Sequence, residues 1–456
     1  MNGVYVLDAP LGARNHRRQR RGRVRLAPLT TLAAMWCGLA AVIGLWWFDT
    51  ATLSGTAGWL TGAGQITGLM AGYSCAVLLL LMARVPLLDR AIGTDRMARW
   101  HAMAGRYTIC LVAAHVALVI AGIALTARAS VIGEAATVVL TYPDMINAAI
   151  AFGLLVATGV ISARAARSRL SYETWHYLHL ATYLAIFLAF AHQLSNGSDF
   201  VGNGAARAAW YTLYLSVAAA LVWFRFLAPV RNALRHRLRV AEVRAESPGV
   251  VSIYITGHQL DRLGARAGQF FRWRFLAKGL WWTANPYSLS AAPNPQYLRI
   301  TVRGVGDHSR ALFRLRPGTR VWAEGPYGGL TARLRSTNRS LLIAGGIGIT
   351  PLRALMETLP GDITLLYRCR RADDLPLRAE IDALAAARHA TVHYVVDGMA
   401  WGRAMSTAVG LRRMVMGLSE HDVYLCGPPG MTSAIAETLR DAGVPRGRIH
   451  YESFAL

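Results

Sequence analysis

The sequence contains few cysteines and few acidic residues. Five cysteines are spread over 456 residues and no CxxC motif occurs, so we expect neither a disulfide nor a zinc site. Asp and Glu number 25 against 49 Lys and Arg, and the formal net charge is +24. In a soluble protein this balance would indicate nucleic-acid binding. The placement of the apolar and basic residues favours a membrane protein instead.

Runs of apolar residues long enough to cross a bilayer occupy the first half of the chain. Hydrophobic residues make up 54% of the sequence, and a membrane span needs about 20 residues in succession. Six such runs are present, at about 29–48, 66–82, 102–126, 144–163, 174–193 and 208–224. We therefore predict a six-helix transmembrane bundle over 29–228, preceded by a basic tail at 1–28.

Arginine supplies almost all of the positive charge, and it is concentrated in alternate connections. The tail and the 83–100 and 164–173 connections are rich in arginine, whereas 49–65, 127–143 and 194–207 contain little. The positive-inside rule then predicts a multi-pass protein of the cytoplasmic (inner) membrane with both termini in the cytoplasm. The tail is too charged for a cleaved signal peptide. We expect it to contact anionic lipid, with a nucleic-acid arm as the less favoured alternative.

Four histidines lie in the third and fifth spans, one near each membrane surface in each span. His101 and His115 are 14 residues apart and His179 and His192 are 13 apart, so each pair is separated by roughly 20 Å along its helix. An imidazole in hydrocarbon needs a partner, and the two spans run in the same direction. We predict two stacked haems, ligated by His101 with His179 and by His115 with His192. Hydrogen bonding within the bundle is the alternative for each ring.

The positions of these histidines around their helices predict an irregularity in the fifth span. Those of the third span return to within about 40° of one face, but thirteen residues leave His179 and His192 about 140° apart on an ideal helix. Using His176 instead of His179 gives about 160° and a poorer match in depth. We therefore expect an irregular turn in the fifth span, between Leu180 and Ala191.

Beyond residue 228 the pattern changes to short alternating strands and turns. Segments such as "AGQFFRWRF" and "LRITVRG" predict an antiparallel β-barrel over 235–335. "NPYSLSAAP" presents the flat ring of Tyr287 beside the hydroxyl of Ser288. "VRGVGDHSRAL" combines the basic Arg303, a glycine turn and the Ser309 hydroxyl, which suits a pyrophosphate. Ordinary turns are the alternative for both segments.

The last part of the chain, 338–456, has the pattern of an α/β nucleotide-binding domain. "LLIAGGIGITPLRALMETL" predicts a buried strand, a glycine-rich turn and a helix, in which Gly346 and Gly348 let the backbone approach a phosphate. The complete GxGxxG motif is missing. The next strand ends in arginines that include Arg368 and Arg371, without an acid placed for the ribose diol. This favours NADPH over NADH, and a solvated arginine cluster is the alternative.

These features, taken in order, resemble a known family. The paired histidines are followed by NPYS, GDHS, GGIGITP, CGPPGM and a terminal ESF. This series is similar to the flavocytochrome b family of ferric reductases and NADPH oxidases, over about residues 60–456. The second half resembles ferredoxin–NADP reductase modules. The resemblance implies FAD, NADPH and two b-type haems as cofactors.

The resemblance also implies roles for individual residues. The family's haem ligands match the four histidines, including the spacings of 14 and 13, and this favours His179 over His176. The residues that would contact the flavin and its pyrophosphate are Tyr287, Ser288, Gly306 and Ser309. The residues that would form the NADPH phosphate loop are Gly346, Gly348, Thr350 and Pro351. The residues at which nicotinamide meets flavin would be Cys426, Gly427 and the ring-covering Phe454, of which Cys426 and Phe454 would be catalytic.

One position departs from the family pattern. The residue that opens the flavin motif is arginine in the reductases and histidine in many oxidases, whereas here it is Asn285. Asparagine supplies no charge to the pyrophosphate, so we expect Arg303 or Arg310 to do so.

The predicted activity is that of an NADPH-dependent flavocytochrome b oxidoreductase. Electrons would pass from cytosolic NADPH through FAD and the two haems to an external acceptor. Ferric iron is favoured because of the family's breadth in bacteria. Dioxygen, giving superoxide, is one alternative, and a partner protein or quinone that receives the electrons is another.

Overall fold

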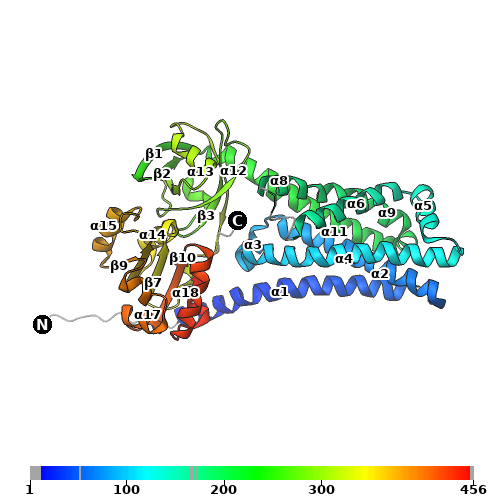
Figure 1. Cartoon of the computed structure of the whole chain (residues 1–456), viewed down its shortest axis with the longest axis horizontal. Helices are drawn as coiled ribbons and strands as arrows, with labels where there is room; N and C mark the ends of the chain where they lie inside the picture. Colours follow the sequence, from blue (N-terminus) through cyan, green and yellow to red (C-terminus); the bar gives the residue numbers. More distant parts are fainter. Residues whose placement is uncertain (1–11, 51–52, 164–168, 171, 452–456) are drawn as a thin grey trace. The chain divides into compact units, whose positions relative to one another are not determined.

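The computed structural model describes residues 12–50, 53–163, 169–170 and 172–451. The chain divides into two compact units, Met1–Ile92 with Arg96–Arg225, and Gly93–Asp95 with Phe226–Leu456. Their helices and strands are labelled in Figure 1. Helices make up the secondary structure described for the first unit, and all the described strands belong to the second.

The first unit contains long apolar helices joined by short ones. They are α1 (Gly12–Asp49), α2 (Gly55–Met82), α3 (Pro86–Ile92), α4 (Thr94–Ala127), α5 (Val131–Thr141), α6 (Met145–Ser162), α8 (Tyr172–His179), α9 (Ala181–Asn196), α10 (Ser198–Val201) and α11 (Gly204–Val222). The short helix α5 lies where the sequence predicted a loop at 127–143.

The prediction of six membrane spans is confirmed for the described residues. The helical stretches that are long and apolar enough are Leu29–Phe48, Gly55–Met82, Arg96–Ala127, Met145–Ser162, Thr174–Asn196 and Gly204–His236. The last one continues past its predicted end, through a π-helix (Trp223–Leu227) into α12 (Ala228–His236). Large apolar side chains such as Trp47 and Phe187 are exposed on these helices, as expected for surfaces that face lipid.

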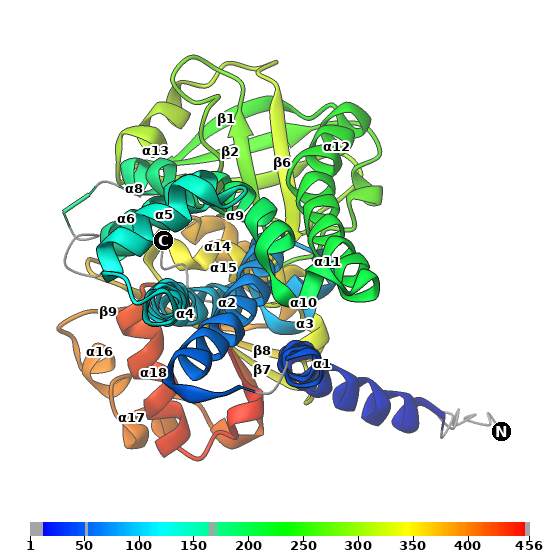
Figure 2. The ribbon, with the colours of Figure 1, turned by 90° about the vertical axis from the view of Figure 1, so that its right-hand side faces the viewer.

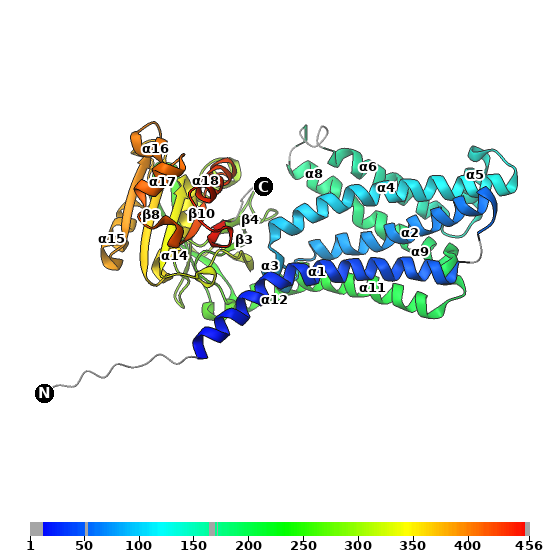
Figure 3. The ribbon, with the colours of Figure 1, turned by 90° about the horizontal axis from the view of Figure 1, so that it is seen from below.

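Helices α2 and α4 approach each other closely at glycines. A Cβ atom on Gly122 would lie 2.8 Å from the backbone nitrogen of Thr61 and 3.0 Å from the carbonyl oxygen of Ala57. A Cβ atom on Gly64 would lie 2.9 Å from the backbone nitrogen of Val119. Small residues stabilise helix pairs in lipid because they let the backbones come into van der Waals contact. Helix α2 also packs against α1 and α11, and α6 packs against α9 (Figures 2 and 3).

The fifth span is interrupted at one residue. Helix α8 ends at His179 and α9 begins at Ala181. The backbone N–H of Leu180 lies 3.1 Å from the carbonyl oxygen of His176 and 3.2 Å from that of Tyr177, and the Thr182 hydroxyl donates to the carbonyl oxygen of His179 at 2.7 Å. The helix is therefore irregular at Leu180, at the edge of the interval in which an irregular turn was predicted, although the backbone of Leu180 keeps helical dihedral angles.

The second unit begins with two antiparallel sheets of three strands each. Their strands are β1 (Arg239–Ser247), β2 (Val250–Thr256), β3 (Phe270–Phe275), β4 (Asn285–Ser288), β5 (Leu298–Arg303) and β6 (Val321–Tyr327). The strand orders are β1-β2-β5 and β4-β3-β6. The short helix α13 (Asp307–Ala311) follows β5.

The predicted closed barrel is not confirmed. Isolated bridges, Arg239 with Arg320 and Leu289 with Ile300, lie where the two sheets would have to join. Strand β3 shows why each sheet is nevertheless stable. Its residues Phe271, Trp273 and Phe275 are fully buried, while the intervening side chains are partly exposed, which is the alternation of a strand with one face in a core.

The second unit continues with a five-stranded parallel sheet. It contains β7 (Arg339–Gly345), β8 (Asp362–Cys369), β9 (Thr391–Val396), β10 (His421–Cys426) and β11 (Ile449–Tyr451) in the order β11-β10-β7-β8-β9. Its helices are α14 (Ile349–Thr358), α15 (Arg378–Arg388), α16 (Ala400–Ala404), α17 (Ala408–Met414) and α18 (Pro429–Asp441). The chain reverses its direction across the sheet between β7 and β10, and ligands of such sheets bind at this switch point, beyond the carboxyl ends of the strands.

A buried carboxylate anchors the opposite end of β10. Asp422 is fully buried and accepts hydrogen bonds from the backbone N–H groups and the hydroxyls of Ser336 and Thr337. Its Oδ1 lies 3.4 Å from Nε2 of His450 on β11. Burial by itself would raise the pKa of this carboxyl, but the hydrogen bonds from His450, Ser336 and Thr337 outweigh it and hold the pKa well below the usual range.

We expect Asp422→Asn to lower the free energy of unfolding by about 2–4 kcal/mol at neutral pH, because several buried donors lose their charged acceptor. The depressed pKa makes the carboxylate's contribution complete above the unfolded value of about 4, and it is lost as the pH falls below that value. Thermal unfolding of the full chain at neutral pH and at pH about 3 measures the effect. An equal difference between variant and wild type at both values would contradict it.

Candidate functional site

The glycine-rich turn and the end of β10 lie together at the switch point of the parallel sheet. Cys426, the last residue of β10, pairs with Ala344 of β7, and the turn Gly346–Gly348 leads from β7 into α14. A Cβ atom on Gly348 would lie 2.3 Å from the carbonyl oxygen of Cys426. Gly346 has φ +53, a conformation that favours glycine. The structure therefore brings together two segments that lie far apart in the sequence.

The neighbouring residues close this turn. The hydroxyl of Thr350 donates to the carbonyl oxygen of Ile347 at 3.1 Å, and both Thr350 and Pro351 are buried. A Cβ atom on Gly427 would lie 3.2 Å from the Cα atom of Gly345. Two backbone segments therefore meet here, with the side chain of Met431 against both glycines. Backbone amides at the start of a helix such as α14 suit a phosphate group.

The predicted arginines lie at the same edge, and both are paired with carboxylates. Arg368 is opposite Gly345 in the sheet, and its Nε lies 2.6 Å from Oδ1 of Asp397. Arg371 is largely exposed and forms an ion pair with Asp373. Neither carboxylate was predicted from the sequence, although Asp373 follows the arginines within the same "RCRRADD" segment.

Tyr287 and Ser288 are held on β4 by strand pairing. Tyr287 pairs with Phe271 of β3, and its carbonyl oxygen accepts a hydrogen bond from the indole N–H of Trp273 at 2.9 Å. Burial raises the pKa of the Tyr287 phenol to about 12, so this ring is neutral at physiological pH. Ser288 is buried. The strand thus presents a neutral aromatic ring from a rigid position.

The predicted pyrophosphate turn is closed by its own serine. The hydroxyl oxygen of Ser309 accepts from the backbone N–H groups of Val305 and Gly306, both at 3.0 Å. It donates to the carbonyl oxygen of Gly306 at 2.9 Å. Ser309 therefore fixes the shape of the turn, whereas the sequence pattern had suggested that its hydroxyl faces the ligand.

A side-chain contact joins the two predicted flavin segments. The amide nitrogen of Asn285 lies 2.9 Å and 3.0 Å from the two ring nitrogens of His308. Burial lowers the pKa of the His308 imidazole, so the ring is mostly neutral at pH 7 and accepts from Asn285. This contact links the start of β4 to α13.

Arg303 is engaged by a carboxylate. Its Nη1 and Nη2 atoms lie 2.9 Å and 2.5 Å from the two carboxylate oxygens of Asp374. These hydrogen bonds raise the pKa of Arg303 and lower that of Asp374. Arg310 is exposed and lies 3.7 Å from Asp307. Both arginines expected at the pyrophosphate thus have an acidic neighbour, and the pair of Arg303 with Asp374 connects the end of β5 to the loop after β8.

The histidines of the third span are oriented by α2. Nδ1 of His101 lies 3.2 Å from the carbonyl oxygen of Leu78, and Nδ1 of His115 lies 2.7 Å from that of Gly64. A Cβ atom on Gly68 would lie 2.5 Å from Nδ1 of His115, so glycine makes room for this ring. A hydrogen bond at Nδ1 fixes the tautomer and leaves Nε2 as the metal-binding nitrogen, as in many metal sites.

The structure brings His101 and His179 together. Their ring centroids lie 6.1 Å apart, with 71° between the ring planes. Two imidazole nitrogens that share one metal ion at about 2 Å each place the centroids about 6 Å apart. His179 is also supported by Ser162, whose Oγ lies 3.4 Å from its Nδ1, and by the stacked ring of Trp175. The residues present fit a metal ion held between these two rings.

His192 is the remaining predicted ligand. Its Nδ1 is buried and meets no acceptor at hydrogen-bond geometry among the described residues. Phe454, the predicted cover of the flavin ring, lies outside the described residues.

Two family models match the chain. One is the ferric reductase like transmembrane component, which matches residues 67–190. The other is the oxidoreductase NAD-binding domain, which matches residues 342–437. The chain therefore combines a ferric reductase-like transmembrane domain with an oxidoreductase NAD-binding domain. Its second unit is a ferredoxin–NADP reductase-like module. The family's transmembrane match includes His101, His115 and His179, and its nucleotide match runs from β7 into α18 with the glycine turn and Cys426.

Curated relatives match less than half of the chain each. A flavohemoprotein from Chromobacterium violaceum is 31% identical over 246 residues, 47% of this chain and 59% of that protein. The ferredoxin reductase component of a 3-ketosteroid-9-alpha-monooxygenase from Mycolicibacterium smegmatis is 29% identical, over 48% of this chain and 65% of that protein. Ferredoxin–NADP reductase B from Sorangium cellulosum is 31% identical, over 37% of this chain and 77% of that protein. The chain thus spans less than two thirds of the length of the first two of these relatives.

Proposed function

We propose that the protein is a membrane oxidoreductase of the flavocytochrome b type, carrying electrons from cytosolic NADPH through FAD and two b-type haems to an external acceptor, with ferric iron favoured. The observation that carries this proposal is the pair His101 and His179. Their rings come from two different spans and lie 6.1 Å apart between centroids, with 71° between their planes, in a chain whose second unit is a reductase-like module.

Each segment of the chain would have one role. The basic tail at 1–28 would lie in the cytoplasm, and the transmembrane domain at 29–228 would hold the haems. The domain at 235–335 would bind FAD, and the domain at 338–456 would bind NADPH. The arginine-rich connections support cytoplasmic termini in the cytoplasmic membrane, because basic loops are retained on that side.

On the flavin side, the side chains of the protein would bind and orient the FAD and set the charge around it. When bound, FAD would take a hydride from NADPH and pass single electrons to haem, which is chemistry that no side chain provides. Tyr287 would offer a neutral ring to the flavin and Ser288 a hydroxyl. Gly306 and Ser309 would shape the turn beside the pyrophosphate. Arg303 would release the carboxylate of Asp374 and bind oxygens of the FAD pyrophosphate instead.

On the nicotinamide side the backbone does most of the binding. The turn Gly346–Gly348, followed by Thr350 and Pro351, would present amides to the phosphates of NADPH at the start of α14. Cys426 and Gly427 would line the place where nicotinamide meets flavin, with Phe454 covering the flavin when nicotinamide is absent. Arg368 and Arg371 would bind the 2′-phosphate.

In the membrane the histidines would supply the axial nitrogens. His101 with His179 would hold the inner haem, and His115 with His192 the outer one. The carbonyl groups of Leu78 and Gly64 would keep the rings of the third span in the required tautomer.

Arg368→Gln tests the choice of coenzyme. We expect the KM for NADPH to rise about 10- to 100-fold, because a charge-assisted hydrogen bond to phosphate is lost and Asp397 is left unpaired nearby. The KM for NADH should change less than about threefold, since NADH lacks the 2′-phosphate. Arg339→Gln is the matched control. Arg339 lies at the start of β7, at the end of the strand away from the glycine-rich turn, and forms an exposed ion pair with Glu420 there. Equal effects on both coenzymes would contradict the role of Arg368.

The acceptor is tested with the purified full chain in nanodiscs, loaded with haem and FAD and given NADPH. We expect a reduced-minus-oxidised spectrum with b-type bands and reduction of a ferric chelate. A superoxide-dismutase-sensitive signal without comparable ferric reduction would show an oxidase instead. Slow turnover with both acceptors that is restored by membrane extract would show delivery to a partner protein or quinone. A spectrum without b-type bands would refute the haem proposal.

A further inference from the structure

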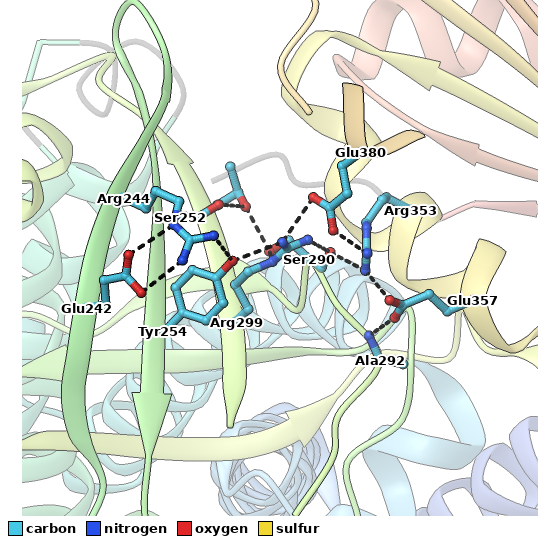
Figure 4. A network of polar contacts seen from close by, with 11 residues as sticks. Glu242, Arg244, Ser252, Tyr254, Ser290, Ala292, Arg299, Arg353, Glu357 and Glu380 are labelled. Carbon is cyan, nitrogen blue, oxygen red and sulfur yellow. Dashed lines mark hydrogen bonds and ion pairs between the residues drawn. The ribbon is translucent and has the colours of Figure 1, made fainter. Parts of the chain in front are cut away.

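Four charged side chains connect the antiparallel sheets of the second unit to the helices of its parallel sheet (Figure 4). Arg299 on β5 and Arg353 on α14 have side chains that are 4% and 8% exposed. Glu380, in the first turn of α15, accepts from Arg299 at 3.0 Å and also from Arg353. Glu357 lies one helical turn from Arg353 and pairs with it at 2.6 Å. Two positive and two negative groups thus balance one another.

The same side chains hold the segment that continues the NPYS motif. The carbonyl oxygen of Ser290 accepts from Nη2 of Arg299 at 2.6 Å and from Nη1 of Arg353 at 3.3 Å. The Ser290 hydroxyl accepts from Nε of Arg299 at 3.1 Å. Glu357 accepts from the backbone N–H of Ala292. Residues 290–292 are therefore fixed from β5 on one side and from α14 on the other.

The location of this network gives it a role beyond stability. Ser290 follows Ser288 by two residues, and Arg353 follows Thr350 by three, so the network belongs to the same chain segments as both halves of the proposed site. Buried ion pairs commonly contribute no more to stability than apolar residues of similar size, whereas removing one partner leaves a buried charge uncompensated. Their directional hydrogen bonds fix one relative position of the connected segments.

We propose that Arg353 and Glu380 are positioning residues for hydride transfer, which hold the flavin strand and the nicotinamide helix at the separation that the reaction needs. This inference rests on the proposed function. Arg353 and Glu380 act through Ser290, Ala292 and α14 and contribute no reacting group. Misplacement of reacting groups by about 1 Å is sufficient to slow such a step about 100-fold.

The test uses Glu380→Gln in the full chain. We expect FAD content and the Kd for NADP+ to stay within about twofold of wild type, and anaerobic flavin reduction by NADPH to slow about 10- to 100-fold. Two readouts do not depend on turnover. The long-wavelength absorbance that forms when NADP+ is added to reduced protein should weaken, and amide exchange over 289–292 should accelerate. Glu380→Asp, which keeps the charge, should recover part of both.

Glu242→Gln is the matched control. Glu242 lies at the edge of the same network, where it pairs with the exposed Arg244, and it should leave all readouts unchanged. Glu357→Gln is the second variant if Glu380→Gln does not fold, and slowing of flavin reduction is expected for it as well. Flavin reduction at the wild-type rate in these variants, or equal slowing in the control, would overturn the inference. A wild-type chain that binds no FAD or NADPH would refute the proposed function itself, and the positioning role with it.

Discussion

Replacing His115 with leucine is expected to remove one of the two proposed haems and to slow reduction of the external acceptor by more than about 100-fold. Leucine fills a similar volume but offers no nitrogen to iron. The other histidine of α4, His101, lies fourteen residues away along the helix, so it is not placed to take over the role of His115. NADPH should still reduce FAD, because the residues proposed for that step lie in the other unit of the chain.

Haem counted per chain by its pyridine complex, together with flavin reduction, measures this result. His192→Leu should give the same loss, since the two residues are proposed to share one iron. His176→Leu is the control, because it removes an imidazole from the same span as His192 without removing a proposed ligand. Retention of both haems in the His115 and His192 variants would show that the pairing is wrong.

Gly348→Ala is expected to abolish binding of the nicotinamide coenzyme and to slow flavin reduction by more than about 100-fold. The added Cβ would lie 2.3 Å from the carbonyl oxygen, 2.6 Å from the carbonyl carbon of Cys426 and 2.8 Å from the nitrogen of Gly427. These are backbone atoms in a parallel sheet, so they cannot move aside as a flexible side chain can. The turn and the end of β10 must therefore separate, which displaces both from the switch point.

Titration with NADP+, followed by the flavin absorbance, measures the loss of binding. Gly430→Ala is a matched control, because it lies in α18 near the same edge and an added Cβ would meet nothing within 4 Å. FAD content should remain near that of wild type, since Tyr287 and Ser288 lie on another sheet. Normal NADP+ affinity in Gly348→Ala would contradict the assignment of the phosphate loop.

Features encoded by local periodicity were predictable from the sequence. The six spans follow from apolar runs of bilayer length, and the parallel sheet follows from buried strands with glycine at their ends. The break at Leu180 was predictable as well, because thirteen residues of ideal helix place His179 and His192 on different faces. The bounds were less accurate, as in the second span, which begins at Gly55, because small polar residues extend a helix without adding to its hydropathy.

Contacts between distant residues were not predictable. Asp374 binds Arg303 across 71 positions and Asp397 binds Arg368 across 29, and nothing near these aspartates in the sequence indicates their partners. The support of His179 by Ser162 is of the same kind. The barrel was expected from strand patterns alone, but alternation specifies which face of a strand is buried and not whether the last strand pairs with the first.

The ion pair of Arg368 with Asp397 has a consequence for turnover. A phosphate that binds Arg368 competes with this carboxylate, so Asp397 acts as a tethered competitor for the anion. Such a competitor lowers the net affinity and is ready to take the arginine back when the phosphate leaves. Product release is thereby favoured, which suits an enzyme that must exchange a spent coenzyme for a fresh one in every cycle.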